Sequence, residues 1–257
     1  MKTNLTLILI IALTILSCTD CGDDAPIIKN ATTTLKFSHN WNGAAVTNTD
    51  FNTIKYTNAN GDLLSIERLR YVISNITFTT GTNEQIIIND YFLVDVANNN
   101  LSFTTSTEIP IGNYTNVAFT FGLNNEDNSE NYIDLNSASF NVPTMLGGGY
   151  HYMQFDGKFI NASSTEQGFN YHAIRAVDNP GTNPTFPQDT FFTVNLGAIN
   201  ITDDTEIEIK MNIAEWFKTP NLWDLNTLNQ MLMPNSAAQI LMYQNGQNVF
   251  SLGAVTQ

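Results

Sequence analysis

An alternation of apolar and polar side chains with a period of two residues restricts the fold of this chain more than any other feature. In residues 33–41, Leu35, Phe37, His39 and Trp41 point to one side of an extended strand and the residues between them point to the other. Further strands are predicted at residues 69–80, 85–96, 114–123, 190–196 and 205–213. Many short strands in series indicate an all-β fold.

The C-terminal part of the chain departs from this pattern. Residues 236–239 read Ser-Ala-Ala-Gln, a capping box that predicts a helix extending to Asn245, with Gly246 as its stop. Strands first and a helix last favour a single domain over residues 33–257. We therefore expect an antiparallel β-sandwich with a small C-terminal helical cap.

The first residues are typical of a secretion signal rather than of a folded element. Lys2 precedes an apolar run over residues 7–16, which is too short to favour a transmembrane helix. Cys18 directly follows a small residue, as in a bacterial lipobox, so a signal peptide over residues 1–17 and a lipid on the Cys18 sulfur are predicted. Residues 18–32 are predicted to form an acidic flexible tether. We expect an outer membrane lipoprotein, periplasmic or exposed at the cell surface, held at the membrane by that lipid.

Net charge and cysteine content argue against nucleic-acid binding and against a disulfide in the core. The net charge is −14, and it becomes −15 when residues 1–17 are removed, because they contain Lys2 and no acid. Such an acidic chain repels phosphate backbones, so nucleic acid is not an expected partner. Cys18 and Cys21 are the only cysteines. Both precede the predicted domain, and no disulfide is expected in its core.

Two of the three histidines fall in one predicted hairpin, His151 in its first strand and His172 in its second, with a Ser/Thr-rich gap at residues 161–167. A loop centred near Ser164 sets His172 opposite Asp156 and places the two imidazoles about five residues, or roughly 17 Å, apart along the ladder. A shift of one residue reverses the relative faces. A shared site then requires a bulge, an asymmetric loop or strong curl; otherwise one of them pairs with His39 across the sandwich.

The sequence lacks the residue patterns that most kinds of catalysis require, and no enzymatic activity is expected. The predicted domain contains no cysteine and no Gly-x-Ser-x-Gly elbow. The run at residues 147–149 is Gly-Gly-Gly, but it lacks the lysine and the following helix of a phosphate-binding loop, so a structural role is favoured.

Metal binding by imidazole remains, with His151, His172 and His39 as candidate ligands. Three side chains are weaker candidates for soft or metal-proximal positions: Met153 and Met145, which flank His151, and Trp41, which shares a face with His39. Neutral imidazole suits copper and zinc, and thioethers favour copper(I).

These residues also resemble a known family. Residues 149–157 (Gly-Tyr-His-Tyr-Met-Gln-Phe-Asp-Gly), the pair Tyr171-His172 and the segment 119–123 (Phe-Thr-Phe-Gly-Leu) are similar to the MbnP-like copper-binding lipoproteins of the Bacteroidetes branch. Residues 213–218 and 233–235 fit the same branch, and the resemblance covers nearly the whole mature chain.

The resemblance implies a secreted or surface β-sandwich that binds copper(I) through histidines. His172 is the best match to the family pattern, His151 matches its Tyr-His-Tyr-Met segment, and His39 matches only its first strand. In some members the copper site lies beside a tryptophan that a di-haem partner of the MauG type oxidises to kynurenine.

Three hypotheses follow from the sequence. The first is a non-enzymatic lipoprotein that acquires or buffers copper through His151, His172 and His39. The second is a metal-free structural or protein-interaction β-sandwich, in which the aromatic residues only form the core. The third is a zinc hydrolase, which lacks a convincing carboxylate base in this sequence.

Overall fold

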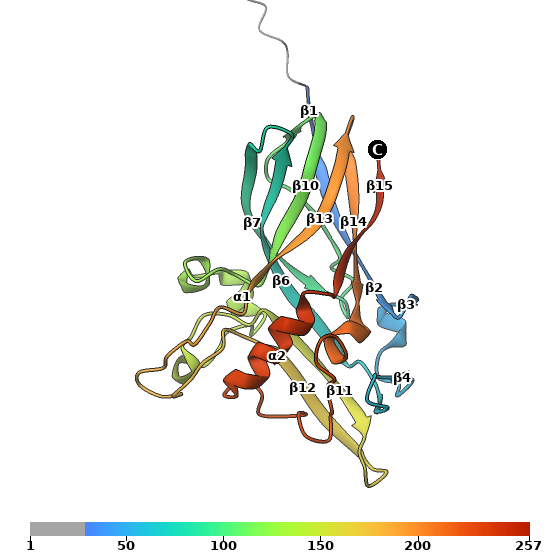
Figure 1. The fold of residues 1–257 in the computed structure, drawn as a ribbon, viewed down its shortest axis with the longest axis vertical. Coiled ribbons are helices and arrows are strands. Elements are labelled where there is room, and N and C mark those ends of the chain that lie inside the picture. The colour runs from blue at the N-terminus through green and yellow to red at the C-terminus, as the bar shows by residue number, and fades with distance from the viewer. Residues whose placement is uncertain (1–28) are drawn as a thin grey trace, which may run out of the picture.

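The computed structural model describes residues 29–257, in which two main β-sheets carry short helices at one side and a longer helix across the front (Figure 1). The strands are β1 (Asn30–Ala31), β2 (Thr33–Trp41), β3 (Ala44–Val46), β4 (Tyr56–Thr57), β5 (Leu63–Leu64), β6 (Arg68–Thr80), β7 (Gln85–Asp95), β8 (Ser102–Thr104), β9 (Ile109–Pro110), β10 (Gly112–Phe121), β11 (Met153–Ile160), β12 (Glu166–Ala173), β13 (Phe192–Ile201), β14 (Thr205–Asn212) and β15 (Phe250–Thr256). The helices are α1 (Ile133–Ser137) and α2 (Ser236–Gly246), with short 3-10 turns η1 (Asn48–Asp50), η2 (Asp127–Ser129), η3 (Thr144–Leu146) and η4 (Ile213–Phe217).

The long strand β6 organises the larger sheet. Its first residues pair with β11, its later residues pair with β10, and β7 runs antiparallel along its other edge. The sheet continues from β10 to β13 and from β11 to β12. Within β6, Tyr71 and Ile73 are buried before an irregular step at Asn75, and Ile76 and Phe78 are buried after it. The extra residue therefore keeps the apolar side chains of both halves on the core side.

The second sheet has the order β15-β14-β2-β3, with β8 beside β2. β2 and β14 pair in parallel, from Thr33 opposite Thr205 to Asn40 opposite Asn212. The all-β, sandwich-like class predicted from the sequence is confirmed, but this pair is a departure from the predicted antiparallel arrangement. Parallel partners are joined by long connections, so no local turn signal marks them in the sequence.

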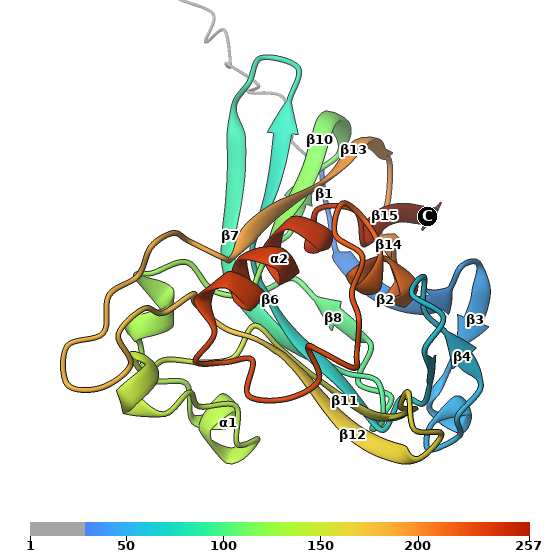
Figure 2. The same cartoon turned by 60° about the horizontal axis from the view of Figure 1, so that its bottom comes forward.

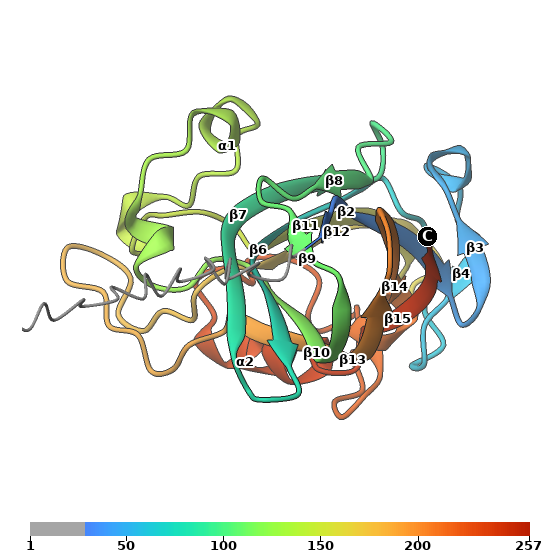
Figure 3. The same cartoon turned by 90° about the horizontal axis from the view of Figure 1, so that it is seen from above.

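The two sheets curl around one large apolar core. Seen from above, β7, β6, β10 and β13 form one wall, and β14, β15 and β2 form another (Figure 3). Phe37 of β2 packs against Tyr71 of β6 and Phe119 of β10, with ring centres 5.9 and 6.1 Å apart. Aromatic contacts of this kind join side chains from both sheets, as expected for a sandwich.

Helix α2 lies across the front of the fold, where it packs against β12 and η4 (Figure 2). The predicted helix is confirmed, but its cap is Asn235, whose side chain accepts a hydrogen bond from the backbone N–H of Ala238. Gly246 belongs to the helix rather than ending it. The chain then returns to the second sheet as β15, a strand that the sequence did not predict.

Several sequence predictions lie outside the described residues. These are the signal peptide, the lipidated Cys18 and the first part of the tether, at residues 18–28. Within residues 29–257, no helix is long and apolar enough to cross a membrane.

Candidate metal centre

The structure brings His151 and His172 together. Their ring centres are 5.2 Å apart and the rings are nearly perpendicular, at 84°. The separation of roughly 17 Å predicted from the hairpin is therefore wrong. The hairpin pairs Gln154, rather than Asp156, with His172. In addition, His151 lies before β11 and leaves the ladder, because its backbone N–H donates to Phe140 O at 2.9 Å. The imidazole can then lie over the end of β12.

The hydrogen bonds of His151 fix its tautomer. Nδ1 lies 2.8 Å from Phe140 O, and a carbonyl oxygen only accepts, so Nδ1 carries the proton. Burial is the main cause that lowers the pKa of His151 to about 4, so the ring is neutral near pH 7. Nε2 consequently has a free lone pair, and it faces Met233 Sδ at 3.2 Å. Because a thioether sulfur has no proton to donate, two lone-pair donors point at each other across this gap.

His172 is oriented from the opposite side. Its Nε2 donates to Asp156 Oδ1 at 2.8 Å, which leaves Nδ1 without a proton when the ring is neutral. Asp156 is itself held by Asn170 Nδ2 at 2.6 Å and by Arg68. Burial would raise the pKa of Asp156, but these contacts and His172 outweigh it and lower the pKa to about 2. A carboxylate behind an imidazole is the arrangement that orients histidine ligands in metal sites.

A buried glutamine fixes the segment that carries Met233 against the hairpin. Gln239 Nε2 donates to His172 O at 2.8 Å and to Leu232 O at 3.0 Å. Gln239 Oε1 accepts from Ile174 N at 2.8 Å. One side chain from α2 therefore holds the end of β12 and the Met233 segment at a fixed distance.

His172 and Met233 border an apolar cavity of about 440 Å³, and His151 contacts both residues without lining the cavity itself. The residues that line it are Met145, Leu146, Asn170, His172, Met231, Leu232, Met233 and Pro234. Met145 comes from η3 and Met231 from the segment before α2. The cavity thus combines one imidazole and three thioethers, with no carboxylate among the residues that line it.

The geometry of this cluster fits a metal ion. A metal–nitrogen bond of about 2.0 Å places the centre of an imidazole roughly 3.1 Å from the metal, so two rings at a trigonal angle have centres about 5.4 Å apart. The observed separation is 5.2 Å. Nitrogen and sulfur ligands at about 2.0 and 2.3 Å lie about 3.1 to 3.7 Å apart for bond angles of about 90° to 120°. The Nε2–Sδ distance of 3.2 Å falls in this range.

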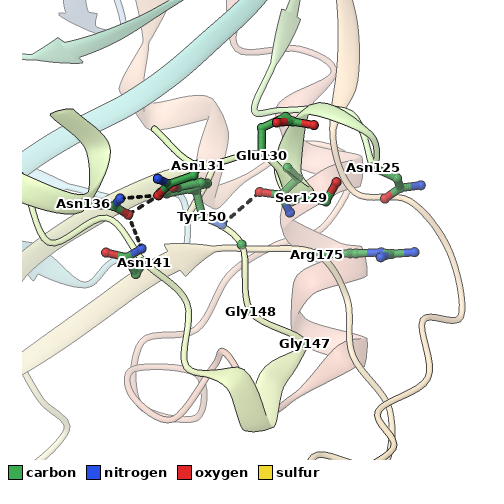
Figure 4. A pocket seen from close by; sticks show the side chains of 12 residues that line it. Asn125, Ser129, Glu130, Asn131, Asn136, Asn141, Gly147, Gly148, Tyr150 and Arg175 are labelled. Carbon is green, nitrogen blue, oxygen red and sulfur yellow. Dashed lines mark hydrogen bonds between the residues drawn. The ribbon is translucent and has the colours of Figure 1, made fainter. Parts of the chain in front are cut away.

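A second cavity, of about 400 Å³, is lined by Gly147, Gly148 and Gly149 together with polar side chains (Figure 4). Its walls are mainly asparagines that bond to each other and to Tyr150. Asn136 Oδ1, for example, accepts from Asn141 Nδ2 at 2.6 Å. Gly149 has φ +74, and a Cβ there would meet Asn128 at 2.7 Å, so this glycine permits a close backbone approach. The glycine run therefore builds a polar wall, consistent with the predicted structural role.

The remaining candidates are dispersed through the fold. His39 Nε2 lies 3.0 Å from the Tyr71 hydroxyl in the core, and within the described residues its ring makes no contact with the other two histidines. Burial lowers its pKa to about 4. Trp41 stacks on Tyr56 and donates from Nε1 to Thr57 O at 3.2 Å.

Of the two flanking methionines, Met145 lines the apolar cavity and Met153 is fully buried in the main core. Met233 and Met231 were missed by the sequence reasoning. The segment Met-Leu-Met-Pro at residues 231–234 places two thioethers close together, which is a sequence signal for soft metal donors far from His151.

The fold and the cluster define a sandwich-like β-domain with a histidine–methionine centre at one end of its larger sheet. The chain belongs to the MbnP family, whose family model matches residues 30–234. Among solved structures, MbnP from Methylosinus trichosporium matches with a TM-score of 0.57 and 14% identity, covering 88% of this chain and 99% of that one. At this identity the likeness concerns the fold alone. No curated protein sequence matches the chain significantly.

Proposed function

We propose that this protein binds copper(I) through His151 and His172, with Met233 as a third donor, and that it acquires or buffers the metal without catalysing a reaction. The observation that carries the proposal is the approach of His151 Nε2 to Met233 Sδ at 3.2 Å, with a lone pair on each atom. The unprotonated Nε2 and the thioether sulfur are both acceptors, so no hydrogen bond joins them and both lone pairs are available to a cation. Membership of the MbnP family supports the same role.

The donor set favours copper(I) over zinc. Thioethers are soft ligands that select copper(I), whereas zinc prefers thiolate, imidazole and carboxylate. The thioether carries no charge, the His151 ring is neutral near pH 7, and the Asp156 carboxylate is already paired with Arg68. Arg68 and Arg70 also act to lower the pKa of His151, so they place positive potential at its ring. A singly charged ion is less disfavoured there than a doubly charged one.

The surrounding residues hold the donors ready before the metal arrives. Phe140 O accepts from Nδ1 of His151 and Asp156 accepts from Nε2 of His172, so the other nitrogen of each ring is the one available to the proposed site. Gln239 keeps the Met233 segment in place. The protein would act in the cell envelope as a lipoprotein attached through Cys18, which agrees with the signal peptide predicted from the sequence.

The proposal is tested by anaerobic copper(I) loading followed by metal analysis at equilibrium with a competing chelator. The parent chain is expected to retain one copper, and the double variant His151→Ala, His172→Ala to retain none. The variant His39→Asn is the matched control, because its ring is bound to Tyr71, and it is expected to retain copper like the parent. Equal retention by the parent and the double variant would remove both histidines as ligands, and no retention by the parent would favour the metal-free module.

A further inference from the structure

The methionines of this chain divide into two sets. Met1 lies outside the described residues, and the other six are either fully buried or beside the apolar cavity. The buried set consists of Met153, Met211 and Met242. The cavity set consists of Met145, Met231 and Met233. Among the described residues, every methionine that is not in the apolar core therefore borders one cavity.

Two members of the cavity set are strongly exposed. Met145 is 58% exposed and Met231 is 78% exposed, whereas Met233 is partly buried beside His151. Large apolar side chains in water stabilise nothing by burial, and a group of them on one surface usually marks a binding function. The exposed pair shares this cavity with His172 and Met233, whose side chains are only partly exposed.

The backbone at Met231 is strained. Its φ is +56°, in the left-handed region that glycine and asparagine occupy readily. A methionine there costs about 1 kcal/mol or more relative to glycine. The turn buries Leu232 and leaves Met231 and Met233 both lining the cavity. Strain of this kind persists only where the surrounding structure holds it, and such residues cluster at functional sites.

We infer that Met145 and Met231 form a transient copper(I) site that receives the ion at the surface and passes it to His151, His172 and Met233. This inference rests on the proposed copper site and adds its uptake route. Two thioethers without an imidazole bind copper(I) weakly enough to release it, and the His–His–Met set holds it more tightly. No proton, electron or covalent bond changes hands, because the ion only exchanges ligands. The copper(I) ion is the cargo of both sites.

The test compares the rate and the extent of uptake by the full chain. Copper(I) is presented anaerobically as its coloured bicinchoninate complex, and the loss of colour is followed in a stopped-flow cell. The variant M145L/M231L keeps side chains of similar volume and removes both sulfurs. We expect it to bind as much copper as the parent at equilibrium but about tenfold more slowly, within the range by which association rates vary among mutants of one site.

Two controls make the result specific. The variant M153L removes a core sulfur and is expected to take up copper at the parental rate. The triple variant M145L/M231L/L222M restores an exposed thioether outside the cavity, because Leu222 is 61% exposed and does not line it. We expect the triple variant to remain slow.

Each other outcome overturns the inference. Equal rates for the parent and M145L/M231L, with copper still lost in the variant His151→Ala, His172→Ala, would refute the uptake route and leave the copper site standing. A lower equilibrium affinity in M145L/M231L would make the two sulfurs ligands of the main site. Recovery of the rate by L222M would show that any exposed thioether suffices. If the parent takes up no copper, the uptake route and the proposed function fail together.

Discussion

Removal of the Asp156 carboxylate should weaken copper(I) binding through its effect on His172. Asp156 accepts the Nε2 proton of His172 at 2.8 Å and so directs Nδ1 toward the site. Loss of such a partner behind a ligand typically lowers metal affinity by about 10- to 100-fold, or about 1.4 to 2.8 kcal/mol. For Asp156→Ala we expect a loss in this range. Asp156→Asn keeps an acceptor oxygen in place, so its loss should be smaller than about tenfold.

The same substitution has a calculable effect on stability. The contacts of Asp156 lower its pKa from 3.8 to about 2. A lowering of this size corresponds to about 2 kcal/mol, which solvent around the partly exposed Arg68 reduces to about 1 to 2 kcal/mol at neutral pH. Because the folded pKa is lowered, this contribution is present above the unfolded pKa and disappears as the pH falls through the folded value. The metal-free Asp156→Ala chain should therefore remain folded at pH 7.

The assay is competition for copper(I) against a chelator of known affinity at pH 7, with urea unfolding of the metal-free variants beside it. Asp50→Ala is the control, since Asp50 is paired with Lys55 on an exposed turn and its loss changes the net charge equally. Unchanged copper affinity in a folded Asp156→Ala chain would refute the orienting role of Asp156. An equal loss in Asp50→Ala would attribute the effect to net charge alone.

Three further results are expected. Met233→Leu should lower copper(I) affinity by about tenfold or more in the same competition, and Met153→Leu should leave it unchanged, because only the first sulfur faces an imidazole. In the folded protein His39 and His151 have pKa values of about 4, below the unfolded value of about 6.5. The contribution of their neutral rings to the unfolding free energy is therefore complete above about pH 6.5. Measured in urea, the unfolding free energy should fall by roughly 3 kcal/mol per histidine as the pH drops to about 4. A flat profile over that interval would contradict buried, neutral rings. Gln239→Ala should lower the unfolding free energy by about 2 to 3 kcal/mol, since it leaves two buried backbone groups and one partly buried group without this partner.

The strands were predictable because alternation is a local property. Residues 33–41 read as one strand and form β2 with the same bounds, including the burial of Phe37 and Trp41 on one side. The short strand β15 was missed, because Gly253 interrupts its pattern and the preceding helix suggested that the strands had ended. Glycine weakens a strand signal without preventing the strand.

The meeting of His151 and His172 was not predictable from the hairpin alone. The register depends on the five-residue loop between Asn161 and Thr165, where the Asn161 side chain accepts hydrogen bonds from the Ser163 and Thr165 amides. These bonds centre the loop on Ser163, one residue before the predicted Ser164. The partner of His172 in the hairpin therefore shifts by two residues, from Asp156 to Gln154. The departure of His151 from the ladder depends on Phe140, which the sequence places in a separate loop.

Met233 lies even further beyond local reasoning. It is 82 residues from His151 along the chain, in an irregular segment without periodicity. The position of Met233 depends on long-range hydrogen bonds from Gln239, and the local sequence around Met233 does not predict such contacts. Only residue type, here two methionines beside a proline, marks the segment before the structure is known.

The parallel pairing of β2 with β14 also dictates when this protein can fold. Thr32, just before β2, bonds to Asp204 across 172 residues of chain, and the eight paired positions that follow require the same closure. During synthesis, β2 therefore has one edge without its partner until about four fifths of the polypeptide has emerged. Long-range closures of this kind slow folding and leave strand edges open to other chains. A chain stopped before β14 would lack the strand that lies between β15 and β2 in the second sheet. The nascent chain must therefore be protected from aggregation until its synthesis is nearly complete.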